Sequence, residues 1–342
     1  MITAEIACLH DPIDSGHICK VLPGGEIDWQ SPCRKSVEGS YSSNITVKSA
    51  GGNGAGRATH LLLSGNPSKF LQGHNVFGSD DLVSLVYDTF VRVCLSLNIS
   101  PSFKELETVK EGDYRLKNVD INYSFDLPTR ADCLSFIRAL EFKAKTRHGR
   151  PSRKGGTLYF GKGTARWRIK VYCKGEELEA RTKGHRLPLE LEKTPIKNWA
   201  DNKLRVELTL LSKELQEIGI EKARQLTVAR AVELYNRYVR RIDMSEQVSI
   251  TTERQLELPT NLQSSYLHWN NGVDLRAVLS KATFYRHRKG LQEFGIDIAI
   301  RKETIDRSNV IPLIRVLEAV PASVPDWAFD LKLVHPSARV AV

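Results

Sequence analysis

The stretch RWRIKVYCKG, residues 166–175, decides how the fold is read, because its side chains alternate in character with period two. Successive side chains of a β-strand point to opposite faces of the sheet. The apolar residues therefore share one face: Trp167, Ile169, Val171 and Cys173. Tyr172 lies on the other face with four cations: Arg166, Arg168, Lys170 and Lys174. The pattern predicts a strand with one buried face and one strongly basic face.

A tyrosine in a row of cations is a candidate nucleophile. The cations would attract a phosphodiester and stabilise a phenolate, so Tyr172 is predicted to attack a phosphate, with Lys174 offsetting the charge. Arg166, Arg168 and Lys170 are predicted to bind DNA phosphates. The alternative is an edge strand with a solvated basic face and an ordinary amphipathic tyrosine.

Two further strands share this design. KNVDINYSF, residues 117–125, puts Asp120 on its polar face, and LRVELTLL, residues 204–211, puts Glu207 on its polar face. If the three strands are neighbours, the two carboxylates lie beside Tyr172. Carboxylate oxygens suit Mg²⁺ or Mn²⁺, so the sequence predicts a metal-assisted site for phosphoryl transfer.

Composition supports a polyanionic partner. The 342 residues carry a net charge of +10, and many of the cations fall between residues 143 and 183. The alternative is a basic face that serves solubility. No apolar stretch reaches the length that a bilayer requires, and the six cysteines lack CxxC spacing, so we expect a cytoplasmic protein with reduced thiols and no membrane partner.

The order of elements predicts an α+β fold with an antiparallel sheet and helices on one face. We expect a catalytic domain over residues 1–250, a helix-turn-helix domain over 255–310 and an irregular tail over 311–342. Within the first domain, residues 36–56 are rich in Ser, Gly and Asn and predict a loop. A helix is expected over 79–98 with Ser79 as N-cap, and another from Thr129.

The segment DLRAVLSKATFYRHRKGLQEFG, residues 274–295, has a helix-turn-helix pattern. Its second helix, with Thr283 as candidate N-cap, predicts a DNA-reading face: Arg286, His287, Lys289 and Gln292. The core face would be Phe284, Leu291 and Phe294. The alternative is a small helical unit that packs on the sheet or binds a host protein.

The turn LQGHNVFG, residues 71–78, places His74 and Asn75 between two glycines that permit positive φ. His74 and Asn75 are candidates for contact with DNA, and His74 is also a candidate metal ligand. Equally, the two side chains could cap the neighbouring helix and satisfy hydrogen bonds of the turn.

These motifs together resemble the replication initiators of filamentous bacteriophages, the gene II protein family. The resemblance rests on LQGHNVFG, on HWNNGVDLRAVLSKATFYRHRKGLQEFGIDI and, more weakly, on the strands around Asp120, Tyr172 and Glu207. It implies a rolling-circle initiator that nicks one strand of double-stranded replicative-form DNA and keeps the 5′ phosphate on Tyr172. The single-stranded DNA at the nick then ends in a 3′ hydroxyl that primes synthesis with a host DNA polymerase and helicase.

Some departures restrict this implication. Many rolling-circle nickases carry a His-hydrophobe-His motif, which none of the nine histidines provides, so the metal would depend on carboxylates and at most one histidine. No GxxxxGK[ST] loop is present, so ATP-driven unwinding would come from a partner. The competing interpretation is a non-catalytic, sequence-specific DNA-binding protein, such as a repressor or partition factor.

Overall fold

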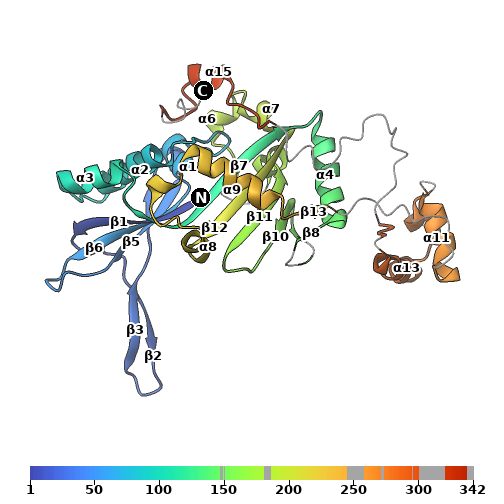
Figure 1. Cartoon of the computed structure of the whole chain (residues 1–342), viewed down its shortest axis with the longest axis horizontal. Helices are drawn as coiled ribbons and strands as arrows, with labels where there is room; N and C mark the ends of the chain where they lie inside the picture. The colour runs from blue at the N-terminus through green and yellow to red at the C-terminus, as the bar shows by residue number, and fades with distance from the viewer. Residues whose placement is uncertain are drawn as a thin grey trace.

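A nine-stranded antiparallel sheet organises the molecule in the computed structural model, which describes residues 1–146, 149, 151–180, 186–244, 258–270, 273–294, 296–299 and 320–336 (Figure 1). In spatial order its strands are β4 (Lys35–Glu38), β5 (Asn44–Ala50), β6 (Ala58–Gly65), β1 (Ile2–His10), β7 (Arg115–Asp126), β12 (Lys203–Leu211), β11 (Trp167–Cys173), β10 (Thr157–Phe160) and β9 (Ser152–Lys154). The predicted α+β class and antiparallel sheet are confirmed.

The helices of the sheet-containing part are α1 (Pro67–Gln72), α2 (Leu82–Ser96), α3 (Phe103–Lys110), α4 (Arg130–Lys143), α5 (Lys174–Glu179), α6 (Leu189–Glu192), α7 (Ile196–Ala200), α8 (Ser212–Glu217) and α9 (Val228–Val239). Helix α4 begins as predicted, because Thr129 and Asp132 form a reciprocal capping box. At α2 the N-cap is Asp81, whose side chain accepts from the backbone N–H of Ser84, so the predicted cap at Ser79 is wrong.

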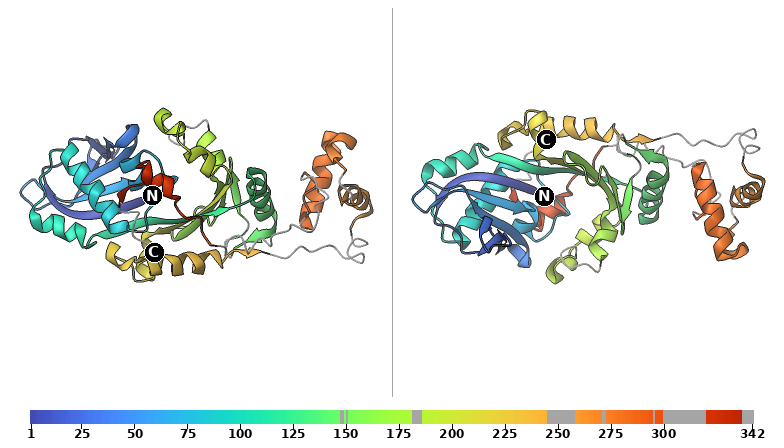
Figure 2. Two further views of the ribbon diagram at one scale, coloured as in Figure 1. Left: turned by 90° about the horizontal axis from the view of Figure 1, so that it is seen from above. Right: turned by 90° about the horizontal axis from the view of Figure 1, so that it is seen from below.

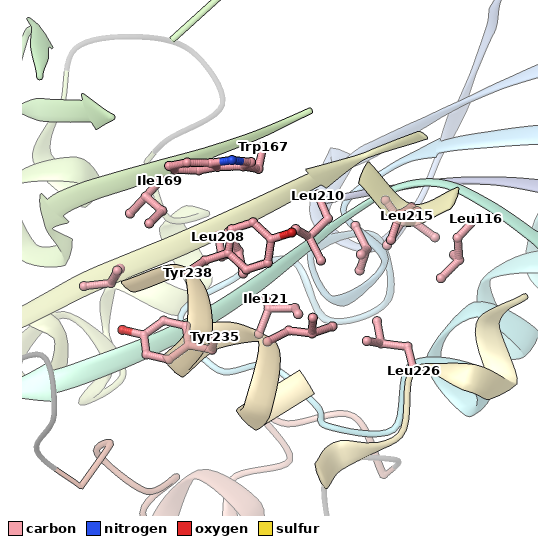
Figure 3. Close-up of a cluster of buried hydrophobic side chains, with 14 of the residues drawn as sticks. Leu116, Ile121, Trp167, Ile169, Leu208, Leu210, Leu215, Leu226, Tyr235 and Tyr238 are labelled. Carbon is pink, nitrogen blue, oxygen red and sulfur yellow. The ribbon is translucent and has the colours of Figure 1, made fainter. Parts of the chain in front are cut away.

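The main hydrophobic core lies between the apolar face of the sheet and helices that include α2, α4 and α9. Figure 3 shows Tyr235 and Tyr238 of α9 facing Leu208 of β12, and the ring of Tyr238 packs edge-on against Trp167 at 5.5 Å between centroids. The apolar face of β11 is therefore the buried face, as the sequence indicates, since Trp167 is fully buried on it.

The opposite face of the sheet is also covered in part. Helices α6 and α7 and the C-terminal α15 (Asp326–Asp330) lie across the sheet from α9 (Figure 2). They form a second apolar cluster together with Val76 and Phe77 from the turn after α1. Residues 320–336, which we call the C-terminal strap, belong to this layer, so the described part of the predicted tail is packed structure.

One N-terminal segment differs from the sequence prediction. Residues 44–50 are strand β5 and not loop, because Ile45, Val47 and Ser49 alternate into the core despite the polar composition around them. Strands β2 (His17–Val21) and β3 (Ile27–Pro32) form a hairpin that projects from the sheet (Figure 1).

The C-terminal helices have a hydrophobic core of their own. They are α11 (Thr260–Asn270), α12 (Leu275–Val278) and α13 (Lys281–Glu293). Helix α12 lies in DLRAVL, at the start of the segment for which the sequence predicts a helix-turn-helix pattern. Helix α13 begins before the predicted cap, since Ser280 and not Thr283 accepts the capping hydrogen bond.

Short strands β8 (Ala144–Lys145) and β13 (Asp243–Met244) pair with each other.

Candidate active site

The polar face of β7, β12 and β11 carries three rows of side chains, because antiparallel register places one residue of each strand opposite the next. The rows are Asp120, Thr209 and Arg168; Asn122, Glu207 and Lys170; and Ser124, Arg205 and Tyr172. Directly opposed residues have Cβ atoms about 5 Å apart. The sheet thus brings Asp120, Glu207 and Tyr172 together from three strands.

Glu207 connects the candidate nucleophile to a cation. The phenol of Tyr172 donates to Oε1 of Glu207 at 2.6 Å, and the ammonium of Lys170 donates to Oε2 at 2.9 Å. Lys170 also lies 3.7 Å from Oδ2 of Asp120. All four polar groups therefore belong to one hydrogen-bonded and ion-paired cluster.

Burial and charge set the protonation of this cluster. Burial, and then the nearby Glu207 carboxylate, raise the pKa of Tyr172 well above its usual value. Burial also acts to raise the pKa of Glu207, but Lys170 and the hydrogen bonds from Tyr172 and Lys170 outweigh it and lower that pKa to about 2. At neutral pH the cluster consists of a phenol, a carboxylate and an ammonium.

The oxygen atoms around Asp120 test whether a divalent cation fits. Among the residues that the structure describes, Oδ1 of Asp120 is buried without a hydrogen-bond partner, and so are Oγ1 of Thr209 and Oδ1 of Asn118 on the same face. The other carboxylate oxygen, Oδ2, faces Lys170 and lies 3.4 Å from the amino group of Met1. Mg²⁺ prefers such oxygen donors and keeps several waters, so it needs only one or two carboxylates.

Glu207 is a less available ligand than Asp120. In the described part of the chain no three His, Cys, Asp or Glu side chains cluster as metal ligands. Both oxygens of Glu207 already accept hydrogen bonds. The residues therefore fit a cation bound chiefly at Asp120, with Glu207 available only if Lys170 releases it.

Two buried cations attach the turn after α1 to this face. Lys174 is fully buried at the start of α5, where it donates to Oδ1 of Asn75 at 2.9 Å and pairs with Glu177. Burial lowers the pKa of Lys174 to about 8. Arg205 donates to the backbone oxygen of Asn75 at 2.8 Å. Lys174 is therefore not on an open, DNA-facing row in this conformation.

His74 lies under the C-terminal strap. It is 2% exposed, and its Nε2 is 2.8 Å from the backbone oxygen of Leu333. Burial lowers the pKa of His74 to about 4, so the neutral ring donates through Nε2 and accepts from the backbone N–H of Val76 through Nδ1. The sequence left two roles open for His74: hydrogen bonding within the turn, and contact with DNA. This geometry favours the first.

Gly73 explains why the turn needs glycine. It caps α1 with φ at 84°, and a Cβ there would lie 2.3 Å from the ring of Tyr41. The left-handed conformation and the close approach both exclude larger residues. His74 and Asn75 are thereby directed at the strap and at Lys174.

The remaining predicted cations of β11 differ in their surroundings. Arg166 reaches two carboxylates of α8, with ion-pair distances of 3.4 Å to Glu214 and 3.5 Å to Glu217. Arg168 has a buried Nε that has no hydrogen-bond partner among the described residues. Of the predicted cations, Arg168 and Lys170 therefore lie in the sheet rows of Asp120 and Glu207, and the ammonium of Lys174 lies 5.9 Å from the centroid of the Tyr172 ring.

The C-terminal helices place the predicted reading residues on two sides of α13. Arg286, Lys289 and Gln292 are exposed, whereas His287 is buried and its Nδ1 is 2.7 Å from Oγ of Ser265. Phe284 and Leu291 are core residues as predicted, but Phe294 is 42% exposed.

Sequence reasoning missed Arg205, although a signal was available. Arg205 precedes Glu207 by two residues, so the alternation that exposed one residue on the polar face placed the other there too. It also missed the Arg288 guanidinium, which binds both oxygens of Asp297 at 2.7 Å. No local pattern indicated that pair, because the partner comes from the turn after the helix.

Within the described ranges, no helix combines the length and hydrophobicity needed to cross a membrane.

Comparison with known proteins adds family information. Residues 1–229 match a family model for the N-terminal part of the phage gene II type of "Replication-associated protein", and residues 250–334 match the model for its C-terminal part. The "Replication-associated protein" of this type from Enterobacteria phage I2-2 is 46% identical over 340 residues, which cover 99% of this chain and 98% of the relative.

A solved structure, the rolling-circle replication initiator protein from Geobacillus stearothermophilus, aligns with 74% of this chain and 89% of its own chain at 11% identity and a TM-score of 0.35. At that score the likeness supports no inference about the present chain.

Proposed function

Because this chain belongs to the gene II family of replication-associated proteins, we propose that it initiates rolling-circle replication by nicking one strand of a duplex phage DNA. The observation that carries the proposal is the 2.6 Å hydrogen bond from Tyr172 to Glu207. A nucleophile next to a group that can accept its proton, and flanked by cations, is the arrangement that covalent catalysis requires.

The reaction would be a transesterification. The phenolic oxygen of Tyr172 attacks the scissile phosphorus, the bond from phosphorus to the 3′ oxygen breaks, and the 5′ phosphate stays on the tyrosine. While the bond between the phenolic oxygen and phosphorus forms, the phenol proton passes to Glu207. The leaving 3′ oxygen takes a proton from solvent. Reversal of these steps rejoins the ends, because the phosphotyrosine keeps the energy of the original bond.

Lys170 and Arg168 would stabilise charge on the scissile phosphate. A divalent cation, Mg²⁺ or Mn²⁺, when bound chiefly at Asp120, with Glu207 as a second ligand only if Lys170 releases it, would supply further electrostatic stabilisation of that phosphate. Lys174 would act indirectly, because its hydrogen bond to Asn75 holds the turn in place beside Tyr172.

The DNA-binding roles would be divided between two parts of the chain. The polar face of the sheet would bind the single strand at the nick without reading its sequence, and α13 would read the duplex origin through Arg286, Lys289 and Gln292. The released 3′ hydroxyl would prime a host polymerase, with unwinding by a host helicase.

The test is covalent trapping. The Tyr172→Phe variant should lose nicking and denaturation-resistant adduct formation, while its affinity for single-stranded DNA stays near that of the wild-type chain, since the ring and the cations remain. Peptide mapping of the wild-type adduct should identify Tyr172. A chain that binds the origin but never forms an adduct would instead be a repressor or partition factor, and nicking by the Phe variant at the wild-type rate would place the nucleophile elsewhere.

A further inference from the structure

A second tyrosine lies beside the candidate active site. Tyr159 of β10 is directly opposite Lys170 of β11, so it extends the row that contains Glu207 and Asn122. Lys170 and Tyr172 are two residues apart on the same face, which makes Tyr159 the diagonal neighbour of Tyr172 at about 7–8 Å.

The ring of Tyr159 has a cation over it. The ammonium of Lys162 lies 5.3 Å from the centroid of the ring, and Lys162 is exposed. Gly161, in the turn between β10 and β11, adopts a φ of 69°. Tyr159 itself is half-buried, so it is held by the sheet and still reaches solvent.

The surrounding charge is not neutralised locally. In the described part of the chain neither Lys162 nor Arg168 has a carboxylate within ion-pair distance, and Nε of Arg168 has no hydrogen-bond partner. By contrast, Arg153 and Arg166 on the neighbouring segments pair with Glu141 and Glu214. Among the described residues, Lys162 and Arg168, which flank Tyr159, are therefore cations that lack a local counter-charge.

The open side of the site is at this end. Tyr172 is 6% exposed, whereas Lys170 keeps 22% of its side-chain surface and Lys162 is exposed. A substrate that reaches Tyr172 along the polar face would thus pass over Tyr159 first.

We propose that Tyr159, with Lys162 and Arg168, forms a stacking platform that holds a base of the single-stranded substrate next to the scissile phosphate. Bases stack on aromatic rings in grooves whose cations follow the backbone, and such stacking tolerates any base. The platform refines the proposed function, on which its catalytic meaning rests, but its binding role can be measured without any cleavage.

The experiment uses the full chain carrying Tyr172→Phe and a single-stranded dT oligonucleotide with one 2-aminopurine. Tyr159→Leu should weaken binding roughly 5- to 150-fold and abolish quenching of the 2-aminopurine fluorescence. Tyr159→Phe keeps the ring and should bind within about 2-fold of the parent. Lys162→Ala, at an exposed position that does not endanger folding, should weaken binding and lower the salt slope by about 0.7.

Phe103→Leu, at a 79% exposed aromatic on α3, is the matched control and should change nothing. Unaltered affinity of Tyr159→Leu together with unaltered affinity of Lys162→Ala would overturn the platform. An equal loss in Tyr159→Phe and Tyr159→Leu would also overturn it, because the hydroxyl and not the ring would then be responsible. Failure of the proposed function shows separately, as absence of an adduct in the chain that retains Tyr172.

Discussion

At the scale of single residues, Asp120 and Glu207 have different surroundings although the sequence treats them as a pair. Both oxygens of Glu207 are engaged, one by Tyr172 and the other by Lys170. Asp120 has a buried oxygen without a hydrogen-bond partner in the part of the chain that the structure describes. Glu207 is therefore placed to orient the phenol and accept its proton, whereas Asp120 is the better candidate for holding a cation.

This difference predicts distinct losses. Asp120→Asn should weaken Mn²⁺ binding, measured by calorimetric titration, more than Glu207→Gln does. Glu207→Gln should instead slow single-turnover adduct formation by roughly 10²- to 10⁴-fold, the usual contribution of a general base.

Glu217→Gln, at an exposed carboxylate that also faces an arginine, is the control for loss of charge and should affect neither measurement. Equal loss of Mn²⁺ affinity in both active-site variants would contradict the separation of roles and would restore the carboxylate pair as joint ligands.

At the scale of elements, the turn after α1 and the C-terminal strap stabilise each other. His74 and Leu333 are joined by a hydrogen bond across 259 residues of sequence, and the rings of Phe77 and Trp327 pack edge-on at 5.7 Å between centroids. Asn75 of this turn also accepts hydrogen bonds from Lys174 and Arg205. The strap therefore contributes to the shape of the candidate site without contacting Tyr172 through any described hydrogen bond.

Protonation of His74 should loosen this contact. Its pKa is lowered from 6.5 in the unfolded chain to about 4, so between these values the unfolded state binds more protons and stability falls as the pH falls. The free energy of unfolding should therefore be about 2 kcal/mol lower at pH 5 than at pH 7. Above about pH 6.5 the contribution of His74 no longer changes appreciably with pH.

Urea unfolding at the two pH values would measure this contribution. His74→Gln, whose amide can still donate to Leu333, should show a smaller loss of stability on acidification than the wild-type chain. His17→Gln, at an exposed position of β2, is the control and should behave like the wild type. Identical pH dependence of the wild-type and His74→Gln chains would mean that His74 does not titrate between these values.

At the scale of the whole molecule, the sheet-containing part and the C-terminal helices have separate hydrophobic cores. We propose that the first part cleaves DNA and that the second recognises the origin duplex. Arg286→Ala with Lys289→Ala should reduce the preference for origin duplex over random duplex, because paired hydrogen bonds to base edges contribute about 1–3 kcal/mol each. Cleavage of a single-stranded oligonucleotide should be unchanged. Binding assays at matched salt would measure the preference, with Arg237→Ala on α9 as the control.

Point substitutions are preferable to truncation after residue 255, because that truncation also removes the strap. Truncation after residue 319 isolates the effect of the strap and should destabilise the sheet-containing part while sparing origin preference. Loss of single-strand cleavage in the Arg286 and Lys289 variant would mean that the two parts do not act separately.

The sequence by itself determined the local features of this protein. The alternation in residues 166–175 and 204–211 fixed which side chains share a face, because strand geometry makes neighbours point in opposite directions whatever surrounds them. The capping box at Thr129 likewise depends only on residues within one helical turn. The identification of Tyr172, Asp120 and Glu207 as one group needed only the further assumption that their strands are adjacent.

The tertiary structure alone decided what those faces meet. Strand β5 was hidden by its polar composition, and its burial follows from pairing with β6 and β4. The partial burial of Tyr159, the burial of Lys174 and the contact of His74 with Leu333 depend on sheet register and on segments distant in sequence. Such contacts are specified by the sum of many weak interactions over the whole chain, so no short stretch contains the information that predicts them.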